Sequence, residues 1–110
     1  MSVEHRQLAD GRWFSMPLVE QMANIGSEVE RALNWKARNN GAYCQKAFER
    51  ALELIDFTLE DAKNRHRCSE PARLREAIVD YFYGSNQCSC TEHYWKKYFL
   101  SFSFAARRHC

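Results

Sequence analysis

A chain of 110 residues is long enough to bury one hydrophobic core and too short for two full domains. Its 45% hydrophobic and 14% aromatic content argues against a disordered chain, and a net charge of +2 does not by itself predict binding to nucleic acid. Four Gly and two Pro are too few for the many turns of an all-β fold. No apolar run reaches the roughly 20 residues of a membrane span, and the N-terminus lacks the apolar segment of a signal peptide. We therefore expect a cytoplasmic protein with no membrane contact.

Residues 1–14 are predicted to form an N-terminal arm, and residues 15–110 a single helical domain. Trp13 and Phe14 are large aromatic residues at the end of this arm. We expect them to anchor the arm to the domain.

A first helix is predicted over residues 16–38, where apolar residues recur at spacings of three and four. Ser15 is expected to be its N-cap, and Pro17 is tolerated in a first turn. Gly26 lies in the middle of this helix and costs about 1 kcal/mol relative to alanine. We interpret that glycine as a sign that another helix approaches closely.

A second helix is predicted over residues 42–64, after an Asn-Asn-Gly sequence at 39–41 that is typical of the tight turn between two antiparallel helices. Good helix formers dominate the segment, and nothing in it breaks a helix. Its predicted buried stripe contains four residues at helical spacing: Phe48, Leu52, Ile55 and Leu59.

A third helix is predicted over residues 70–83, capped by Ser69, and a fourth over residues 91–108, capped by Thr91. Residues 98–104 contain an alternating pattern that could form a strand, but a single strand among helices would have no partner, so we expect helix. Four apolar stripes joined by short connections predict an all-α, up-down four-helix bundle, with a long first helical hairpin followed by two shorter helices.

Four segments resemble a family of small, uncharacterised prokaryotic helical-bundle proteins: GRWFSMPLVEQMANIGSEVERALNW, AFERALELIDFTLEDAKNR, RLREAIVDYFYGSN and KKYFLSFSFAAR. The predicted layout is also similar to HEPN (higher-eukaryote-and-prokaryote nucleotide-binding) domains, and to the four-helix accessory proteins of ribosomal RNA intervening sequences and diversity-generating retroelements. HEPN ribonucleases use an Arg followed four to six residues later by His, and none of the four histidines here has an Arg at that spacing. Because architecture does not carry function, the similarity implies at most a non-catalytic relative.

Four carboxylates lie on one line of the second predicted helix: Glu49, Glu53, Asp56 and Glu60. Through Glu53-x-x-Asp56 this segment resembles the all-helical nucleoside triphosphate pyrophosphatases, which implies a Mg²⁺ site. Those enzymes also use a Glu-x-x-Glu pair on the preceding helix, whereas Glu28 and Glu30 here are two residues apart and point to different faces. We therefore favour a solvated face with ion pairs to the third helix, and keep a small metal-dependent nucleotide or RNA hydrolase as the alternative.

Five cysteines are an odd number and follow no pattern of a secreted disulfide framework. Cys88, Cys90 and His93 are close together, but structural zinc usually needs two separated pairs of ligands. A fourth ligand would have to come from elsewhere: Cys68, His66 or Cys110. We expect unliganded cysteines and no cofactor, with a metal or redox module as a third alternative.

Basic residues form two groups that could contact RNA phosphates. The first group surrounds the connection between the second and third helices: Lys63, Arg65, Arg67, Arg73 and Arg75. The second lies on the fourth helix: Lys96, Lys97, Arg107 and Arg108. Basic side chains near helix ends also serve capping and solubility, which is the simpler interpretation.

The fourth helix is apolar nearly all round, a pattern typical of burial on more than one side. Leu100 and Phe104 are expected to form an outward ridge, which Trp13 and Phe14 would cover unless a second copy of the chain does so. We favour self-association. The sequence thus predicts a non-catalytic helical interaction or accessory module that forms homo-oligomers and acts with a protein or ribonucleoprotein partner.

Overall fold

The computed structural model describes residues 12–87 and 89–108, except for the Arg108 side chain. Most of these residues belong to four α-helices: α1 (Leu18–Ala37), α2 (Gly41–Glu60), α3 (Ser69–Tyr83) and α4 (Glu92–Arg108). Among the described residues, two short 3₁₀ turns accompany them, η2 (Trp13–Ser15) and η3 (Ala62–Asn64). The described residues contain no strand, so the all-α prediction is confirmed, including helix over residues 98–104. No described helix is long and apolar enough to cross a membrane.

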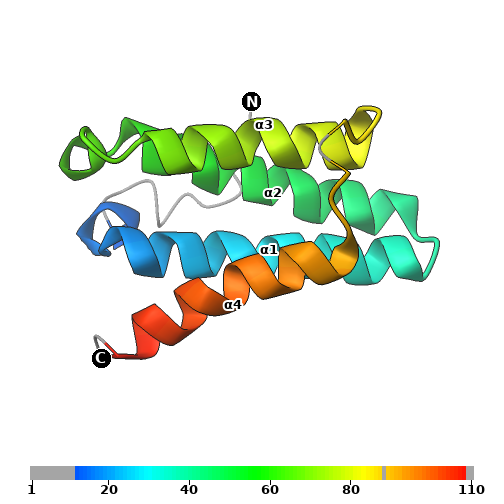
Figure 1. Ribbon diagram of the computed structural model, residues 1–110, viewed down its shortest axis with the longest axis horizontal. Helices are drawn as coiled ribbons and strands as arrows, with labels where there is room; N and C mark the ends of the chain where they lie inside the picture. Colours follow the sequence, from blue (N-terminus) through cyan, green and yellow to red (C-terminus); the bar gives the residue numbers. More distant parts are fainter. Residues whose placement is uncertain (1–11, 88, 109–110) are drawn as a thin grey trace.

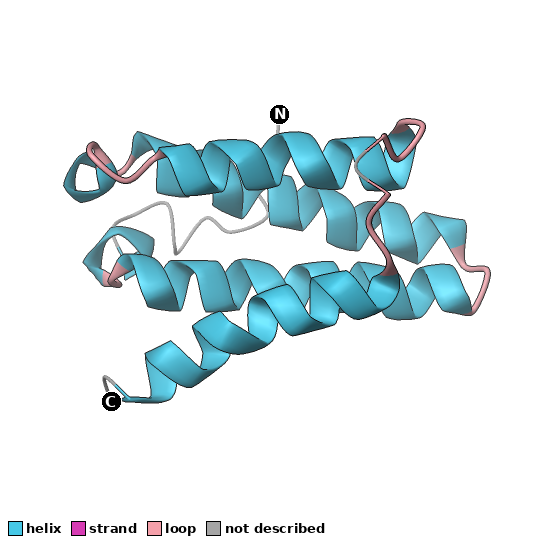
Figure 2. Ribbon diagram, viewed as in Figure 1, coloured by secondary structure: helices cyan, strands magenta, loops and turns pink. Residues whose placement is uncertain are grey.

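The helices are arranged as two neighbouring pairs. Figure 1 shows the chain running along α1, returning along α2, and then passing through α3 and α4. α2 and α4 both pack along α1, and α3 packs on α2. Figure 2 shows α4 close to α1 near its own start and diverging from α1 towards its C-terminal end. The second half of α4 therefore has fewer neighbours than the first.

The core contains residues from every α-helix and from η2. Its largest fully buried apolar side chains are Trp13, Met22, Ile25, Ile55, Ile78 and Trp95. In α2, Phe48 and Ile55 are buried as predicted, whereas Leu52 and Leu59 are half-buried at the edge of the core. α2 presents Ala51 and Leu54 fully to the interior instead, because its main neighbour is α1 and the buried face turns towards it.

Side chains cap two of the helices. The cap predicted at Thr91 is confirmed, because its Oγ1 accepts a hydrogen bond from the Tyr94 amide at 3.1 Å at the start of α4. Within the predicted turn before α2, the Asn40 side-chain oxygen accepts from the Tyr43 amide, also at 3.1 Å. Asn39 has a φ of 59°, a left-handed conformation that asparagine tolerates and that ends α1.

Three of the predicted boundaries are wrong, each for a local reason. Ser15 does not cap α1, because it belongs to η2 and donates its hydroxyl to the Arg12 carbonyl; Pro17 is the N-cap. Ser69 is the first residue of α3 and caps nothing. α2 ends at Glu60 rather than at residue 64, because Asp61 adopts an extended backbone and its side chain caps η3.

Gly26 is a point of very close approach between α1 and α4. A Cβ atom at this position would lie 2.7 Å from the Phe99 ring and 2.8 Å from the Phe99 Cβ, far inside normal contact. The predicted close approach of another helix is therefore confirmed, and the approaching residue is Phe99 of α4.

Buried polar side chains hold η2 against the end of α2. Trp13 Nε1 donates to Thr58 Oγ1 at 3.2 Å, and Gln21 Nε2 donates to Asp61 Oδ2 at 2.9 Å. Asn64 Nδ2 donates to Gln21 Oε1 at 2.8 Å, which closes the chain of contacts. Since buried polar groups are costly unless they are hydrogen-bonded, this network positions the first described residues.

Candidate interaction surface on helix α4

Leu100 and Phe104, here called the α4 ridge, are one helical turn apart on the outside of α4. Their exposed fractions are 54% and 58%. The other large hydrophobic residues that are exposed in the described part of the chain are tyrosines, whose hydroxyls suit a surface position. The ridge is therefore the main purely apolar feature of this surface.

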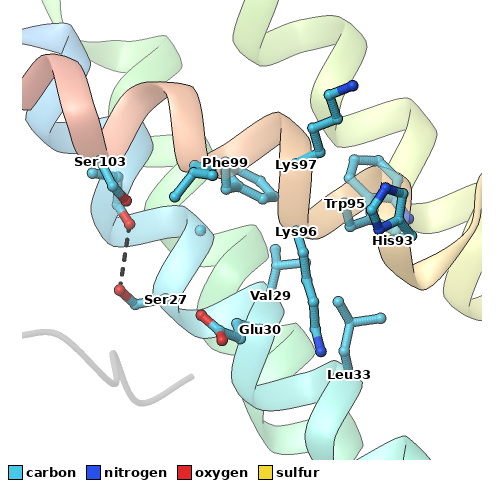
Figure 3. A pocket seen from close by; sticks show the side chains of 13 residues that line it. Ser27, Val29, Glu30, Leu33, His93, Trp95, Lys96, Lys97, Phe99 and Ser103 are labelled. Carbon is cyan, nitrogen blue, oxygen red and sulfur yellow. Dashed lines mark hydrogen bonds between the residues drawn. The ribbon is translucent and has the colours of Figure 1, made fainter.

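A groove lies between α1 and α4, directly beside the ridge, with a volume of about 330 Å³. This α1–α4 groove is lined on the α1 side by Ala23, Gly26, Ser27, Val29, Glu30 and Leu33, and on the α4 side by His93, Trp95, Lys96, Lys97, Phe99, Leu100 and Ser103. Figure 3 shows Phe99 over the α1 helix, with Ser27 and Ser103 facing each other farther along. Because Leu100 is part of its wall, ridge and groove form one continuous surface.

The packing of α4 explains why the ridge is left outside. Trp95 and Phe99 are buried and Phe102 is half-buried, so one face of α4 supplies its intramolecular contacts. Trp95 and Phe99 stack with ring centroids 6.2 Å apart. An α-helix cannot turn two opposite faces to one core, so its second apolar stripe faces outward.

The charged residues along the groove are mainly basic. Lys96 pairs with Glu92 at 3.1 Å, and in Figure 3 its side chain extends down towards Leu33 and Glu30 of α1. Lys97 points to the other side of α4 in the same view. Glu30 is the only acid among the described residues that line the groove.

Trp13 and Phe14, the other two predicted interface residues, lie elsewhere. Trp13 is fully buried in the core of the molecule. Phe14 packs against Phe57 of α2 with ring centroids 6.2 Å apart. These two side chains therefore hold η2 on the helices and do not cover the α4 ridge; residues 1–11 of the predicted arm lie outside the described residues.

The carboxylate line of α2 is engaged in ordinary surface contacts. Asp56 accepts a hydrogen bond from Arg75 of α3 at 2.9 Å, the ion pair expected for a solvated face. Glu49 accepts from Gln45 at 3.1 Å, and Glu60 is exposed. Glu53 is half-buried.

Glu28 and Glu30 of α1 face different ways, as predicted. Glu28 is buried and pairs with Arg31 at 3.2 Å and Arg50 at 3.3 Å, whereas Glu30 is exposed. The preceding helix therefore brings no second carboxylate pair to the α2 line.

The weak metal candidates do not form a cluster in the described part of the chain. No group of three or more His, Cys, Asp or Glu side chains there is arranged to hold a metal ion. Cys90 is half-buried, and its backbone amide donates to Asn86 Oδ1 at 3.0 Å. His93 is exposed at the edge of the α1–α4 groove. Cys88 lies outside the described residues.

The basic residues are divided between paired and exposed positions. Three of them have defined contacts: Lys63 with the Asp61 carboxylate and the Phe14 carbonyl, Arg75 with Asp56, and Lys96 with Glu92. Four others are exposed: Arg65, Arg67 and Arg73 around the α2–α3 connection, and Lys97 on α4. Arg107 is exposed in the last turn of α4, and the Arg108 side chain lies outside the description.

A second cleft, about 450 Å³, lies between α3 and α4 and was not predicted from the sequence. Tyr94, Trp95 and Tyr98 form its α4 side. Tyr98 donates its hydroxyl to Glu70 Oε1 at 2.8 Å, and burial together with this carboxylate raises the pKa of Tyr98 above its usual value. Only the folded chain brings Tyr98 and Glu70 together, because they are far apart in the sequence.

A comparison of this chain with protein-family models, with curated proteins and with solved structures finds no match. Its function is therefore inferred from its own residues and their arrangement.

Proposed function

We propose that this protein is a non-catalytic interaction module, an up-down helical bundle that self-associates through the α4 ridge and acts as an accessory subunit for a protein or ribonucleoprotein partner. The observation that carries the proposal is the exposure of Leu100 and Phe104, at 54% and 58%, beside the α1–α4 groove. Exposed apolar surface of this kind commonly marks a protein interface.

The energetics favour covering the ridge. Complete burial of a leucine or phenylalanine side chain contributes about 1.5–3 kcal/mol. Since each ridge residue is already about half buried in the monomer, its second half would contribute about 1 kcal/mol in an interface. In a symmetric pair, the same gain occurs on both copies, because one surface serves as both partners.

The test is the size of the protein in solution at micromolar concentration, measured by analytical ultracentrifugation. The Leu100→Glu plus Phe104→Glu variant is expected to be monomeric where the natural chain is dimeric or larger. The matched control, Ala42→Glu plus Tyr43→Glu, adds the same charge at exposed positions at the start of α2 and should leave the size unchanged. A natural chain that sediments as a monomer, and that the ridge substitutions do not alter, would contradict self-association.

RNA contact within a ribonucleoprotein is supported by the three exposed arginines around the α2–α3 connection: Arg65, Arg67 and Arg73. Phosphate contacts of this kind are independent of base sequence and weaken as the salt concentration rises. Removing Arg65 and Arg67 together by alanine substitution should reduce the salt dependence of single-stranded RNA binding by about 0.7 per lost phosphate contact. Binding with an unchanged salt slope would exclude this site.

The alternative of a small metal-dependent hydrolase has no comparable support. Asp56 is engaged by Arg75, and Glu28 by Arg31 and Arg50. The hydrolase alternative would be supported if the protein turned over nucleoside triphosphates in the presence of a divalent metal. The Glu53→Gln plus Asp56→Asn variant would then have to lose that activity with its folding unchanged.

A further inference from the structure

We propose that the cleft between α3 and α4 binds a short extended peptide of a partner protein that carries a lysine or arginine side chain. The peptide main chain lies along the floor of the cleft, and the cationic side chain lies against its acidic rim. This inference goes beyond self-association and does not depend on the α4 ridge. At 3.6 residues per turn, Tyr94 and Tyr98 of the cleft lie on a different face of α4 from Leu100 and Phe104.

The cleft exists because α3 and α4 pack on different helices. α3 packs on α2 and α4 packs on α1, and Figure 1 shows α3 above that pair and α4 below it. Tyr98 bridges the two helices by donating its hydroxyl to Glu70 at 2.8 Å, and the Trp95 ring meets the Tyr81 ring edge-on with centroids 6.0 Å apart. The remaining space of about 450 Å³ is within the range of about 300–1,000 Å³ that is usual for ligand sites.

The floor of the cleft contains a hydrogen-bond donor without an acceptor. Trp95 and Leu74 are the buried residues of the lining, at 1% and 3% exposure, so they form its floor. Within the described part of the chain, the buried Nε1–H of Trp95 has no hydrogen-bond partner. A buried donor left unpaired is unfavourable. A main-chain carbonyl oxygen of a bound peptide supplies the missing acceptor, which an ammonium or guanidinium group by itself cannot do.

The α3 side of the rim is acidic. Glu70, Glu76 and Asp80 line it, and Arg73 is the one basic residue among the described lining residues. Neither Glu76 nor Arg73 forms an ion pair with another described residue, so Arg73 does not neutralise its neighbours on α3. Glu70 accepts its hydrogen bond from the uncharged Tyr98 hydroxyl, which holds the carboxylate at the cleft without cancelling its charge. The two glutamates therefore favour a cationic group in the cleft.

The α4 side of the rim suits an organic cation. The rings of Tyr94 and Tyr98 stack with centroids 6.1 Å apart, and Tyr94 is 48% exposed. An exposed ring face attracts a cation, and the apolar stem of lysine or arginine packs on the same surface. No group of three or more His, Cys, Asp or Glu side chains in the described residues is arranged to hold a metal ion. The glutamates also disfavour an acidic peptide or a nucleic acid, so a basic peptide is the occupant that matches both walls and the floor.

The test is binding of a blocked Gly-Lys-Gly peptide, acetylated at its N-terminus and amidated at its C-terminus, followed by NMR of the tryptophan indole N–H signals. The chain has three tryptophans, and the Trp95 signal is assigned by its loss in Trp95→Phe. We expect the peptide to shift the Trp95 signal in a saturable way. The signals of Trp13 and Trp35, which lie outside the cleft, should stay unchanged. The titration is repeated in the Leu100→Glu plus Phe104→Glu variant, so that self-association does not affect the result.

Substitutions at the rim should change the affinity in opposite directions. Glu70→Gln plus Glu76→Gln should weaken binding by about three- to tenfold, because two carboxylates are lost while a glutamine oxygen can still accept from Tyr98. Tyr94→Leu should weaken it by about two- to fivefold, through loss of the contact between the cation and the ring. Arg73→Gln should tighten binding, because it removes the cation that competes for the glutamates.

Matched controls come from the same residue types outside the cleft. Glu49→Gln plus Glu60→Gln removes two exposed carboxylates, and Tyr43→Leu removes a tyrosine that is 49% exposed. Both variants should bind the peptide as the natural chain does. Circular dichroism of every variant checks folding.

Three results would overturn the inference. The first is an unchanged Trp95 signal at peptide concentrations up to tens of millimolar, or binding that none of the rim substitutions alters. The second is equal binding of a blocked Gly-Glu-Gly peptide, which would show that the rim does not select charge. The third is equal binding of butylammonium, which has the cation but no carbonyl, and would show that no main chain is recognised. A monomeric chain that still binds the lysine peptide would contradict self-association and support this site.

Discussion

Replacing Gly26 by alanine separates a local effect from a tertiary one, because the two effects change the free energy of unfolding in opposite directions. Alanine is favoured over glycine within a helix by about 1 kcal/mol, so helix propensity alone predicts a more stable protein. In the folded chain, however, the new methyl group would lie 2.7 Å from two ring atoms of Phe99 and 2.8 Å from its Cβ. Normal contact between carbon atoms is about 3.5–4.0 Å, so α4 would have to move by roughly 1 Å.

The expected magnitude follows from these two terms. Overpacking a well-filled core costs about 1–3 kcal/mol, and subtracting the propensity gain of about 1 kcal/mol leaves a net loss of up to roughly 2 kcal/mol. The clash cannot be relieved by rotating the ring alone, because the Phe99 Cβ is attached directly to the α4 backbone. We therefore expect the Gly26→Ala variant to have a lower free energy of unfolding than the natural chain.

The assay is equilibrium unfolding in urea, followed by circular dichroism at several protein concentrations so that any self-association is separated from folding. Gly41→Ala is the matched control, since a Cβ at that position meets nothing within 4 Å. Phe99→Ala removes both clashing ring atoms, so Gly26→Ala should cost less in that background than in the natural chain, and this coupling can be measured by a double-mutant cycle. A Gly26→Ala variant more stable than the natural chain, as helix propensity alone predicts, would refute the argument.

Two further predictions concern the core and the buried polar network. Ile55→Ala should lower the free energy of unfolding by about 2–5 kcal/mol. Leu52→Ala should lower it clearly less, because Leu52 is only half-buried. Equal losses for the two variants in urea unfolding would contradict the assignment of Leu52 to the edge of the core. For Asp61, burial alone would raise the carboxyl pKa, but hydrogen bonds from Lys63 and Gln21 outweigh it and hold the pKa below its usual value. A pKa lowered by folding means that the ionised carboxylate stabilises the protein above its unfolded-state pKa of about 3.9, and that this stabilisation disappears as the pH falls through the folded-state pKa. The natural chain should therefore be more stable than Asp61→Asn at pH 7, and the difference should shrink between about pH 4 and pH 2; a difference independent of pH would contradict the assigned charge.

The sequence by itself determined the secondary structure and several of its boundaries. Apolar residues three and four apart define helices through interactions within each segment, so the four helices could be predicted before their packing was known. The predicted cap at Thr91 is equally local, because its hydroxyl accepts a hydrogen bond from the backbone amide three residues ahead. Gly26 indicated a close helix approach because its cost within a helix needs a compensating reason.

Only the tertiary structure decided which faces and which distant residues meet. Leu54 rather than Leu52 lies fully inside, because α2 rotates towards α1, and no property of α2 alone sets that rotation. Gln21, Asp61 and Asn64 are polar residues that the sequence suggests for the surface, yet they are buried together because each supplies a hydrogen-bond partner for another.

The α4 ridge depends both on the local sequence pattern and on the tertiary structure. The sequence shows that α4 is apolar on more than one side and predicted Leu100 and Phe104 on the outer one, but it left open whether Trp13 and Phe14 cover them. The structure places Trp13 in the core and Phe14 on α2, so these residues leave the ridge exposed. Helical periodicity is a local property of the chain, whereas the covering of a face depends on contacts between residues far apart in sequence, which only the folded chain brings together.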